Sequence, residues 1–368
     1  MRPRYIVALR VGTPYMASVG YRGDIKTVQK VKRTTIKDVA LRAGTSIATV
    51  SYVLNNSKNR YITAEMRKAV EDAARELGYV KSAVASGLKG KGMGVIAFLT
   101  PQFDNHFFLD VFFAIEKVAN SKGYVLSVCN TFDDPVYEKI VIERMQQLWV
   151  DAYVIIPTHK GTENTEYIRT HGIPYVAVER PLDGISDYNF ISSDNFQAAY
   201  DMTTHFINKG HKRIALAYWD TPITNLYERL DGYKQALRDN NIPFDESLVK
   251  TTSDITHSDG VRVTKEILKD SSITAIFYSQ YILAEGGIKF LYKSKIAIPE
   301  QISVGVLGGP KWVEMSETSF AHMLQPGSAV GNKAAEIIFA ELEDSHSGSI
   351  QEKLPSVLHA GNSIKDIN

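Results

Sequence analysis

The chain has 368 residues, of which 44% are hydrophobic and 23% are charged. This composition excludes a fibrous or disordered protein, and the length exceeds one ordinary core, so we expect two or three folding units. The formal net charge is +1, but the charges are unevenly distributed along the chain. Residues 1–92 contain 18 Lys and Arg and 6 Asp and Glu, whereas the remainder contains 24 Lys and Arg and 35 Asp and Glu. A basic head on an acidic body predicts either a polyanion partner for the head or a solvated basic surface without a partner.

The beginning of the chain carries no membrane signal. No apolar run approaches the roughly 20 residues that cross a bilayer, and the run nearest the start is broken by Arg10, Gly12 and Pro14. The single cysteine, Cys129, cannot form an internal disulfide, which is typical of a reducing compartment. We expect a cytoplasmic protein with no membrane partner, in which residues 1–33 are a flexible arm or lie upstream of the natural start.

Residues 34–79 have the pattern of three short helices. Thr35 and Asp38 have the spacing of a capping box, and Gly44 is suited to end the first helix. Ser46 can cap a second helix over 47–54, and a third begins near Thr63. Two helices joined by a tight glycine turn are the helix-turn-helix pattern of DNA-binding proteins, although a plain three-helix bundle has the same signals.

Residues 80–92, VKSAVASGLKGKG, form a small, basic hinge to the rest of the chain, and their three glycines oppose a helix. From residue 93 to 368, continuous apolar runs such as GVIAFLT and RIALAYW alternate with segments of helix length. This alternation predicts an α/β core of two doubly wound lobes with a ligand cleft between them. We expect lobe 1 at about 93–191 and 325–345, and lobe 2 at about 192–324 and 354–364.

The motifs of common enzymes are missing from the sequence. We find no Walker A loop, no H-E-x-x-H, no paired cysteines and no G-x-S-x-G elbow, and the nine histidines are scattered. The glycines of GKGMG precede a strand, whereas a dinucleotide-binding loop follows one. We therefore expect no catalytic residue, no metal site and no cofactor.

The head sequences TIKDVALRAGTSIATVSYVLN and ITAEMRKAVEDAARELGY resemble the N-terminal signature of the LacI/GalR family of bacterial transcription regulators. HFINKGHKRIAL, ERLDGYKQAL and QPGSAVGNKAAEIIFAEL are similar to later landmarks of that family, so the resemblance covers nearly all of residues 34–365. It implies a periplasmic-binding-protein-like core and a repressor that binds palindromic operator DNA as a homodimer. The alternatives are a small-molecule (sugar or phosphosugar) binding protein with a vestigial head, and an enzyme that uses the cleft.

The resemblance also implies DNA-contacting residues. Ile47, Ala48 and Tyr52 occupy the base-reading positions, and Leu88 matches the hinge leucine that wedges into the minor groove. Tyr52 replaces the Arg common in the family, so we expect no bidentate guanine contact, and packing at the bundle edge is its alternative role. Thr49, Ser51, Asn55 and Thr63 occupy positions that the resemblance implies mainly contact the DNA backbone, and Thr35 and Ala85 are further positions implied to contact DNA.

For the effector, Arg229 matches the sugar-contacting Arg of the family, Phe107 stands at the cleft mouth, and Asp194 is a further candidate. Gln280 and Tyr281 stand where the family has Asn-Asp, and Gly308 and Gly309 replace a second acidic pair. Because both lost carboxylates are typical acceptors for sugar hydroxyls, a neutral sugar is disfavoured. An acidic or phosphorylated metabolite, a protein co-regulator, or no small effector at all remain open.

Overall fold

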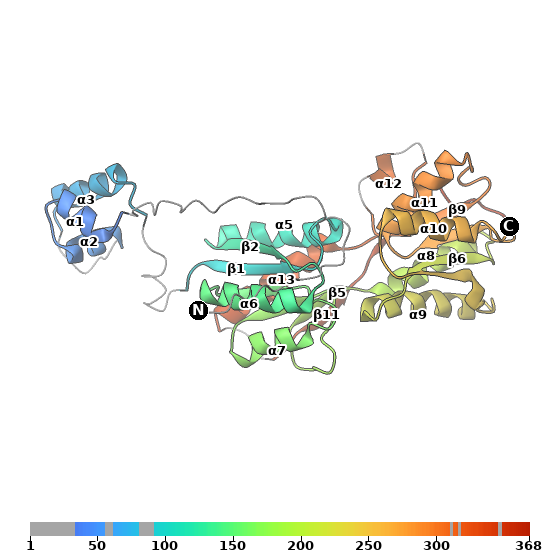
Figure 1. Cartoon of the computed structure of the whole chain (residues 1–368), viewed down its shortest axis with the longest axis horizontal. Coiled ribbons are helices and arrows are strands. Elements are labelled where there is room, and N and C mark those ends of the chain that lie inside the picture. The colour runs from blue at the N-terminus through green and yellow to red at the C-terminus, as the bar shows by residue number, and fades with distance from the viewer. Residues whose placement is uncertain (1–33, 56–61, 81–91, 310–311, 316–317, 345–347) are drawn as a thin grey trace, which may run out of the picture. The chain divides into compact units, whose positions relative to one another are not determined.

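The computed structural model describes residues 34–55, 62–80, 92–309, 312–315, 318–344 and 348–368. The chain divides into two compact units, Met1–Ala85 and Ser86–Asn368, which Figure 1 shows together. The expected extension 1–33 and most of the expected hinge, including Ala85 and Leu88, lie outside the described residues. None of the described helices combines the length and apolarity needed to span a membrane.

The head consists of α1 (Ile36–Arg42), α2 (Ile47–Leu54) and α3 (Ala64–Glu76). Thr35, Ser46 and Thr63 cap the three helices with their hydroxyls, as the sequence predicts. The turn between α1 and α2 depends on Gly44, whose φ of +63° is costly for a residue with a Cβ. The helices enclose a small apolar core of Val39, Ala40, Val50, Val53, Val70, Ala73 and Ala74.

The second unit begins with the strands and helices of lobe 1. In chain order these are β1 (Val95–Thr100), α5 (His106–Ser121), β2 (Val125–Asn130), α6 (Pro135–Gln147), β3 (Ala152–Ile155), α7 (Thr162–Thr170), β4 (Tyr175–Val178) and β5 (Phe190–Ser193). The five strands pair in parallel in the order β2-β1-β3-β4-β5, the doubly wound order of flavodoxin-like folds.

Lobe 2 repeats this arrangement. Its elements are α8 (Asn195–Asn208), β6 (Ile214–Trp219), α9 (Thr224–Asp239), a 3₁₀ turn (Glu246–Leu248), β7 (Val249–Thr252), α10 (His257–Ile267), β8 (Ala275–Tyr278), α11 (Tyr281–Lys293), β9 (Ser303–Leu307), α12 (Trp312–Met315) and β10 (Ala321–Leu324). The strands pair in parallel in the order β7-β6-β8-β9-β10. Both lobes therefore turn the carboxyl ends of their strands to one edge of the sheet.

The last part of the chain contributes to both lobes. α13 (Gly327–Leu342) packs on the first sheet, β11 (Gln351–Leu354) extends that sheet in parallel beside β5, and β12 (Val357–His359) pairs antiparallel with β10. The expected lobe boundary near residue 191 falls within β5, all of which belongs to the first sheet. The chain crosses to lobe 2 at Asp194, two to three residues later, because the ladder with β4 and β11 continues to the end of β5.

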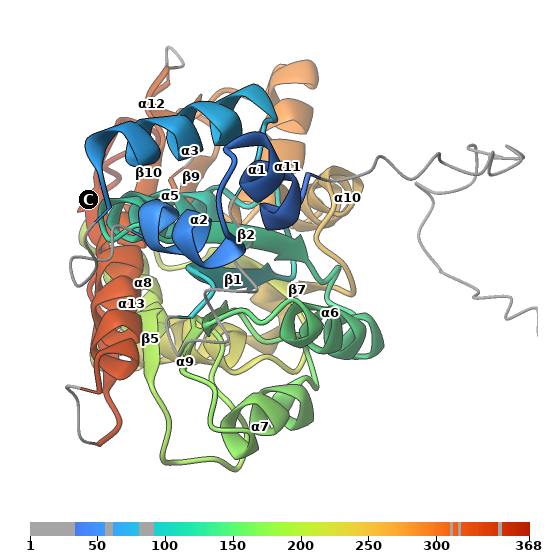
Figure 2. The same ribbon diagram turned by 90° about the vertical axis from the view of Figure 1, so that its left-hand side faces the viewer.

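Each sheet is covered by helices on both faces, as expected for parallel strands. In lobe 1, α5 and α13 share one apolar cluster with the sheet, while α6 and α7 share another on the opposite face (Figure 2). In lobe 2, α8 and α9 cover one face, and α10 and α11 cover the other. This double cover explains the continuous apolar runs that identify the strands in the sequence.

Neighbouring helices approach closely where one of them carries glycine. A Cβ on Gly286 of α11 would collide with the carbonyl oxygen of His257 in α10, and one on Gly260 of α10 would collide with that of Leu283. A Cβ on Gly331 of α13 would likewise collide with the carbonyl oxygen of Val111 in α5. The helix pairs thus pack backbone against backbone, which fixes their spacing.

Replacing Gly286 with Ala should lower the free energy of unfolding of the core by about 2 kcal/mol, because overpacking against a backbone carbonyl outweighs the gain in helix propensity. Urea denaturation followed by circular dichroism measures this change. Lys289→Ala, at an exposed position of the same helix, is the control and should change stability by less than about 0.5 kcal/mol. A Gly286→Ala protein as stable as the wild type would contradict the close-packing argument.

Candidate functional site

The second helix of the head presents the predicted base-reading positions to solvent. Val50 and Val53 are buried beneath α2, whereas Ile47 is 45% exposed and Ala48 is exposed beside it. Tyr52 is half-buried on the same helix and has interactions within the protein, so an edge-packing role remains compatible with its position. The outward side of α2 is therefore small and mainly apolar, a surface suited to contact with thymine methyl groups.

The predicted phosphate-contacting residues lie at helix ends. The hydroxyls of Thr35 and Thr63 accept from the third backbone N–H of α1 and α3, and Thr49 lies 2.9 Å from the capping Ser46, Oγ1 to Oγ. The side-chain amide of Asn55 donates to the Ser51 carbonyl at 2.7 Å, which closes the end of α2. Thr35 and Thr63 thus cap helix N-termini, whose remaining N–H groups and dipoles favour phosphate, whereas Asn55 closes a C-terminus.

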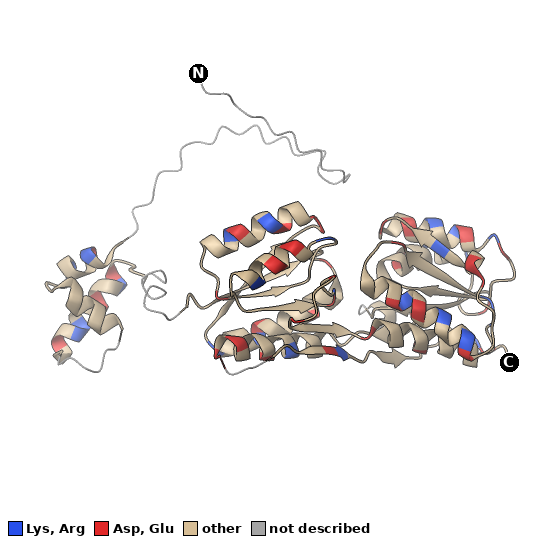
Figure 3. Cartoon of the chain, turned by 90° about the horizontal axis from the view of Figure 1, so that it is seen from below, with Lys and Arg blue, Asp and Glu red and all other residues tan. Residues whose placement is uncertain are grey.

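The positive charge of the first 92 residues does not lie on the described helices. Residues 34–55 and 62–80 contain five basic and five acidic side chains, whereas residues 1–33 contain eight against one. Segments 56–61 and 81–91 add two and three basic residues and no acidic ones. Figure 3 shows Lys and Arg mixed with Asp and Glu along the described helices. The predicted basic head is thus a neutral three-helix bundle with basic flanking sequence.

In the second unit, Arg229 is the centre of a buried polar network. It lies on α9 and is only 6% exposed. Its Nε donates to Asn195 Oδ1 at 2.8 Å, and its Nη1 donates to the carbonyl of Ser279 at 2.6 Å. Burial lowers the pKa of the Arg229 guanidinium, and the nearby Glu179 carboxylate opposes that shift.

Glu179 connects this network to lobe 1. It follows β4 directly, is 2% exposed, and adopts a left-handed φ of +63°, a strained conformation of the kind found at functional sites. Its carboxylate accepts from the Ser193 N–H at 3.0 Å, from Asn195 Nδ2 at 2.9 Å and from Asn225 Nδ2 at 3.2 Å. Asn195 and Asn225 lie in the first turns of α8 and α9 of lobe 2, so a single carboxylate ties the two lobes together.

Two buried atoms of the same network have no hydrogen-bond partner among the described residues. They are Asn225 Oδ1, an acceptor, and Gln280 Nε2, a donor. The other ends of these amides are engaged, since Asn225 donates to Glu179 and Gln280 Oε1 accepts from Ser279 at 2.7 Å. Because buried polar atoms normally find partners, this pair marks a place where a ligand can be recognised.

The remaining predicted effector residues occupy different positions. Phe107 is buried in the first turn of α5 and lines the space between the lobes together with Tyr281, Gly308 and Gly309. Tyr281, the first residue of α11, donates from its hydroxyl to the Asp104 carbonyl of lobe 1 at 3.3 Å. Asp194 accepts from the Gln197 N–H at 2.9 Å, so its carboxylate caps α8. The structure brings Arg229 and Gln280 together, while Asp194 serves a helix end.

Sequence reasoning missed Glu179, Asn195 and Asn225. Glu179 carried a usable signal, because it is a charged residue directly after the apolar run PYVAV, and ligands bind beyond the carboxyl ends of parallel strands. The two asparagines open helices and are indistinguishable in the sequence from ordinary capping residues. Their role depends on the packing of lobe 2 against the first lobe.

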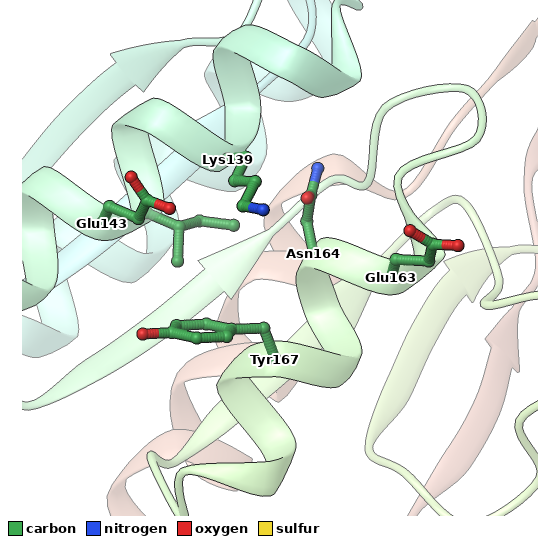
Figure 4. A pocket seen from close by; sticks show the side chains of 6 residues that line it. Lys139, Glu143, Glu163, Asn164 and Tyr167 are labelled. Atoms are coloured by element: carbon green, nitrogen blue, oxygen red, sulfur yellow. The ribbon is translucent and has the colours of Figure 1, made fainter.

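A second hollow, of about 170 Å³, lies on lobe 1 between α6 and α7. Figure 4 shows Lys139 and Glu143 of α6 opposite Glu163, Asn164 and Tyr167 of α7. The Asn164 amide already donates to Glu138 at 2.9 Å, and the Tyr167 hydroxyl to Gln146 at 2.7 Å. Asn164 and Tyr167 are thus engaged within the protein. Over the described residues, no three His, Cys, Asp or Glu side chains converge to hold a metal ion.

Two family descriptions match this chain. Residues 35–82 match "Bacterial regulatory proteins, lacI family", and residues 93–353 match "Periplasmic binding proteins and sugar binding domain of LacI family". The two matches cover the head and nearly all of the two-lobe core.

Curated proteins are similar over most of their length. The HTH-type transcriptional repressor PurR of Vibrio atlanticus is 30% identical, over 91% of this chain and 99% of that protein. The ribose operon repressor of Halalkalibacterium halodurans is 27% identical, over 88% of this chain and 95% of that protein. The HTH-type transcriptional regulator RegA of Clostridium acetobutylicum is 33% identical, over 73% of this chain and 81% of that protein.

Solved structures share the fold. The lac repressor dimer bound to operator and the anti-inducer ONPF superposes with a TM-score of 0.78 at 21% identity, covering 91% of this chain and all of that one. A LacI-family regulator from Silicibacter pomeroyi superposes with a TM-score of 0.76 at 24% identity, covering 90% of this chain and 99% of that one. The regulator CelR in complex with cellobiose gives 0.68 at 23% identity, over 90% and 100%.

Glu179→Gln should lower the free energy of unfolding of the core by about 3 kcal/mol, because the buried Arg229 loses its nearest opposing charge and the amide cannot accept every bond of the carboxylate. Chemical denaturation of the full chain measures the loss. Glu228→Gln is the matched control, since that neighbouring carboxylate on α9 pairs with Lys353 at a partly exposed position. Equal losses in the two variants would refute the bridging role of Glu179.

Proposed function

The chain belongs to the lacI family of bacterial regulatory proteins and is a DNA-binding transcriptional regulator, and we propose that it represses its target genes as a homodimer on a palindromic operator. The observation that carries the proposal is the head, in which three capped helices hold Ile47, Ala48 and Tyr52 on the outer side of α2. One head reads a half-site, and a two-fold dimer presents two heads to a palindrome.

The DNA contacts divide by chemistry. Ile47 and Ala48 contact base edges through apolar surface, and Tyr52 contributes a ring and one hydroxyl in place of a bidentate guanidinium. Thr35, Thr49, Ser51, Asn55 and Thr63 fix the backbone register. Ala85 and Leu88 of the hinge enter the minor groove, as in the family. The basic residues that flank the bundle supply affinity for phosphate without sequence preference.

The core responds to a ligand or a protein co-regulator. The structure of CelR contains bound cellobiose, and that of a LacI-family regulator from Enterococcus faecium contains bound ribose. For this chain, Arg229 and the Gln280 donor support a ligand that carries an anionic group, and the Asn225 acceptor supports a hydroxyl or N–H donor on the same ligand, since neither amide atom has a partner among the described residues. Glu179 is the nearest carboxylate, and its bonds to Ser193, Asn195 and Asn225 leave it little capacity for sugar hydroxyls.

The homodimer forms, in this proposal, along the open edge of lobe 1. Among the described strands, β2 is the last of its sheet and pairs only with β1, so one side of its backbone has no partner among them. Exposed apolar side chains lie on β2, on α6 and in the turns beside them, namely Val125, Val128, Phe132, Val136, Tyr137, Ile140, Leu148 and Trp149. A group of exposed apolar side chains beside an open strand edge is suited to a second copy of the chain.

The relatives are transcription regulators rather than enzymes, and we assign no reaction to the cleft. The protein acts in the cytoplasm, where bacterial DNA lies. Footprinting on DNA upstream of its own gene tests the whole proposal, and a protected palindrome at about 150 mM salt is expected. The salt concentration must be fixed, because affinity for phosphate falls steeply with it. No protection at any palindrome would leave a ligand-binding protein with a vestigial head.

Tyr52→Ala should weaken operator binding about tenfold while leaving binding to random DNA unchanged, because it removes a base contact and no phosphate contact. Fluorescence anisotropy with both DNAs measures the two affinities. Leu41→Ala removes an apolar residue of α1 that is 85% exposed and serves as the control. An equal loss on both DNAs, with reduced thermal stability of the head, would instead assign Tyr52 to the bundle edge.

Val125→Lys should weaken self-association at least tenfold, because it places an uncompensated charge within the proposed interface. Sedimentation equilibrium measures the monomer–dimer constant. Val357→Lys makes the same change at a valine of similar exposure on the edge strand of lobe 2 and should leave the constant unchanged. A dimer that survives Val125→Lys would move the interface to another face.

A further inference from the structure

Tyr281 reaches from lobe 2 to lobe 1. It is the first residue of α11, and its hydroxyl donates to the carbonyl of Asp104, in the loop that precedes α5. Its ring lies 5.6 Å from the ring of His106, centroid to centroid, at the start of α5. Burial raises the pKa of the Tyr281 phenol. One aromatic side chain therefore makes polar and ring contacts with the opposite lobe.

Gly308 makes room for this ring. A Cβ on Gly308 would lie 3.2 Å from Cδ1 of Tyr281, and the φ of +98° at Gly308 further disfavours any other residue. A Cβ on Gly309 would lie 2.6 Å from the His322 ring. Tyr281 and Gly308 are thus mutually compatible departures from the family pattern, because the absence of a side chain at Gly308 leaves room for the ring, whereas Gly309 leaves room for His322.

Little space remains beside the ring. The gap lined by His106, Phe107, Tyr281, Gly308, Gly309 and Leu324 measures about 20 Å³, close to what one water molecule requires. Pockets that hold small molecules typically measure about 300–1,000 Å³. At this end of the cleft, the ring of Tyr281 stands where a ligand would otherwise contact both lobes.

We propose that Tyr281 is the specificity-determining residue of the cleft, an internal occupant that joins the lobes without a ligand and excludes any ring-sized ligand that does not displace it. This inference deepens the proposed function and rests on it for its regulatory meaning. A ligand that enters must compensate for the lost Asp104 and His106 contacts, so recognition favours molecules that bind Arg229, Asn225 and Gln280 strongly.

Hydrogen exchange of the full chain without DNA tests the contact directly. The amides of Phe107 and Leu109 bond to Asn105 at 3.0 Å in lobe 1, far in sequence from residue 281. Tyr281→Ala should accelerate exchange over residues 104–109 at least tenfold. Adding phenol, which replaces the missing ring, should bind this variant saturably and restore slow exchange. Wild-type protein should show no phenol effect.

Three further variants sharpen the experiment. Tyr281→Phe keeps the ring and should exchange within about threefold of the wild type. Tyr292→Ala removes a half-exposed tyrosine of the same helix and should leave residues 104–109 unchanged. Gly308→Ala pushes the ring outward and should reproduce the Tyr281→Ala result, which covers the case in which that variant does not fold.

Unchanged exchange over residues 104–109 in folded Tyr281→Ala or Gly308→Ala would overturn the inference. A change confined to residues 281–287 would do the same, because it would show a local role within α11. Neither result bears on whether the head binds an operator, so failure here and failure of the proposed function are distinguishable.

Discussion

The buried carboxylate of Glu179 is the interaction on which the two-lobe core depends. A carboxylate with 2% exposure is tolerable only when its oxygens accept several hydrogen bonds. Here the donors come from Ser193 of its own sheet and from the first turns of α8 and α9 in lobe 2. Arg229 carries the opposing charge. It donates to Asn195, which in turn donates to Glu179. Any motion of the lobes must therefore break or rearrange this group.

The topology places this group where it is. Each lobe has the strand order 2-1-3-4-5, and residues that follow parallel strands converge at the edge that faces the cleft. Glu179 follows β4, and Ser279 and Gln280 follow β8. Arg229 lies one helical turn beyond Asn225 on α9, so both side chains reach the same space. Tyr281 contacts lobe 1 at another end of the cleft, which gives the lobes a second point of attachment.

Local patterns in the sequence predicted most of the fold but only part of the site. The caps Thr35, Ser46 and Thr63 act within three residues, so they are readable directly, and the helices of the head are confirmed. The buried strands are readable because both their faces are apolar. β5, β7, β10, β11 and β12 were not, since FISS, VKTT, AHML, QEKL and VLH are short and contain polar or exposed residues. Glu179, Asn195 and Asn225 gain their meaning only from contacts across the lobes.

The charge balance of the folded head affects how the protein finds its site. With five basic and five acidic side chains on the described helices, the bundle itself releases few counterions when it docks, while the flanking segments release many. With the DNA contacts that we propose, sliding along genomic DNA depends on the flanking segments, and stopping at the operator depends on α2. Shortening the basic arms would slow the search without altering the preferred sequence, so speed and selectivity can evolve separately in this chain.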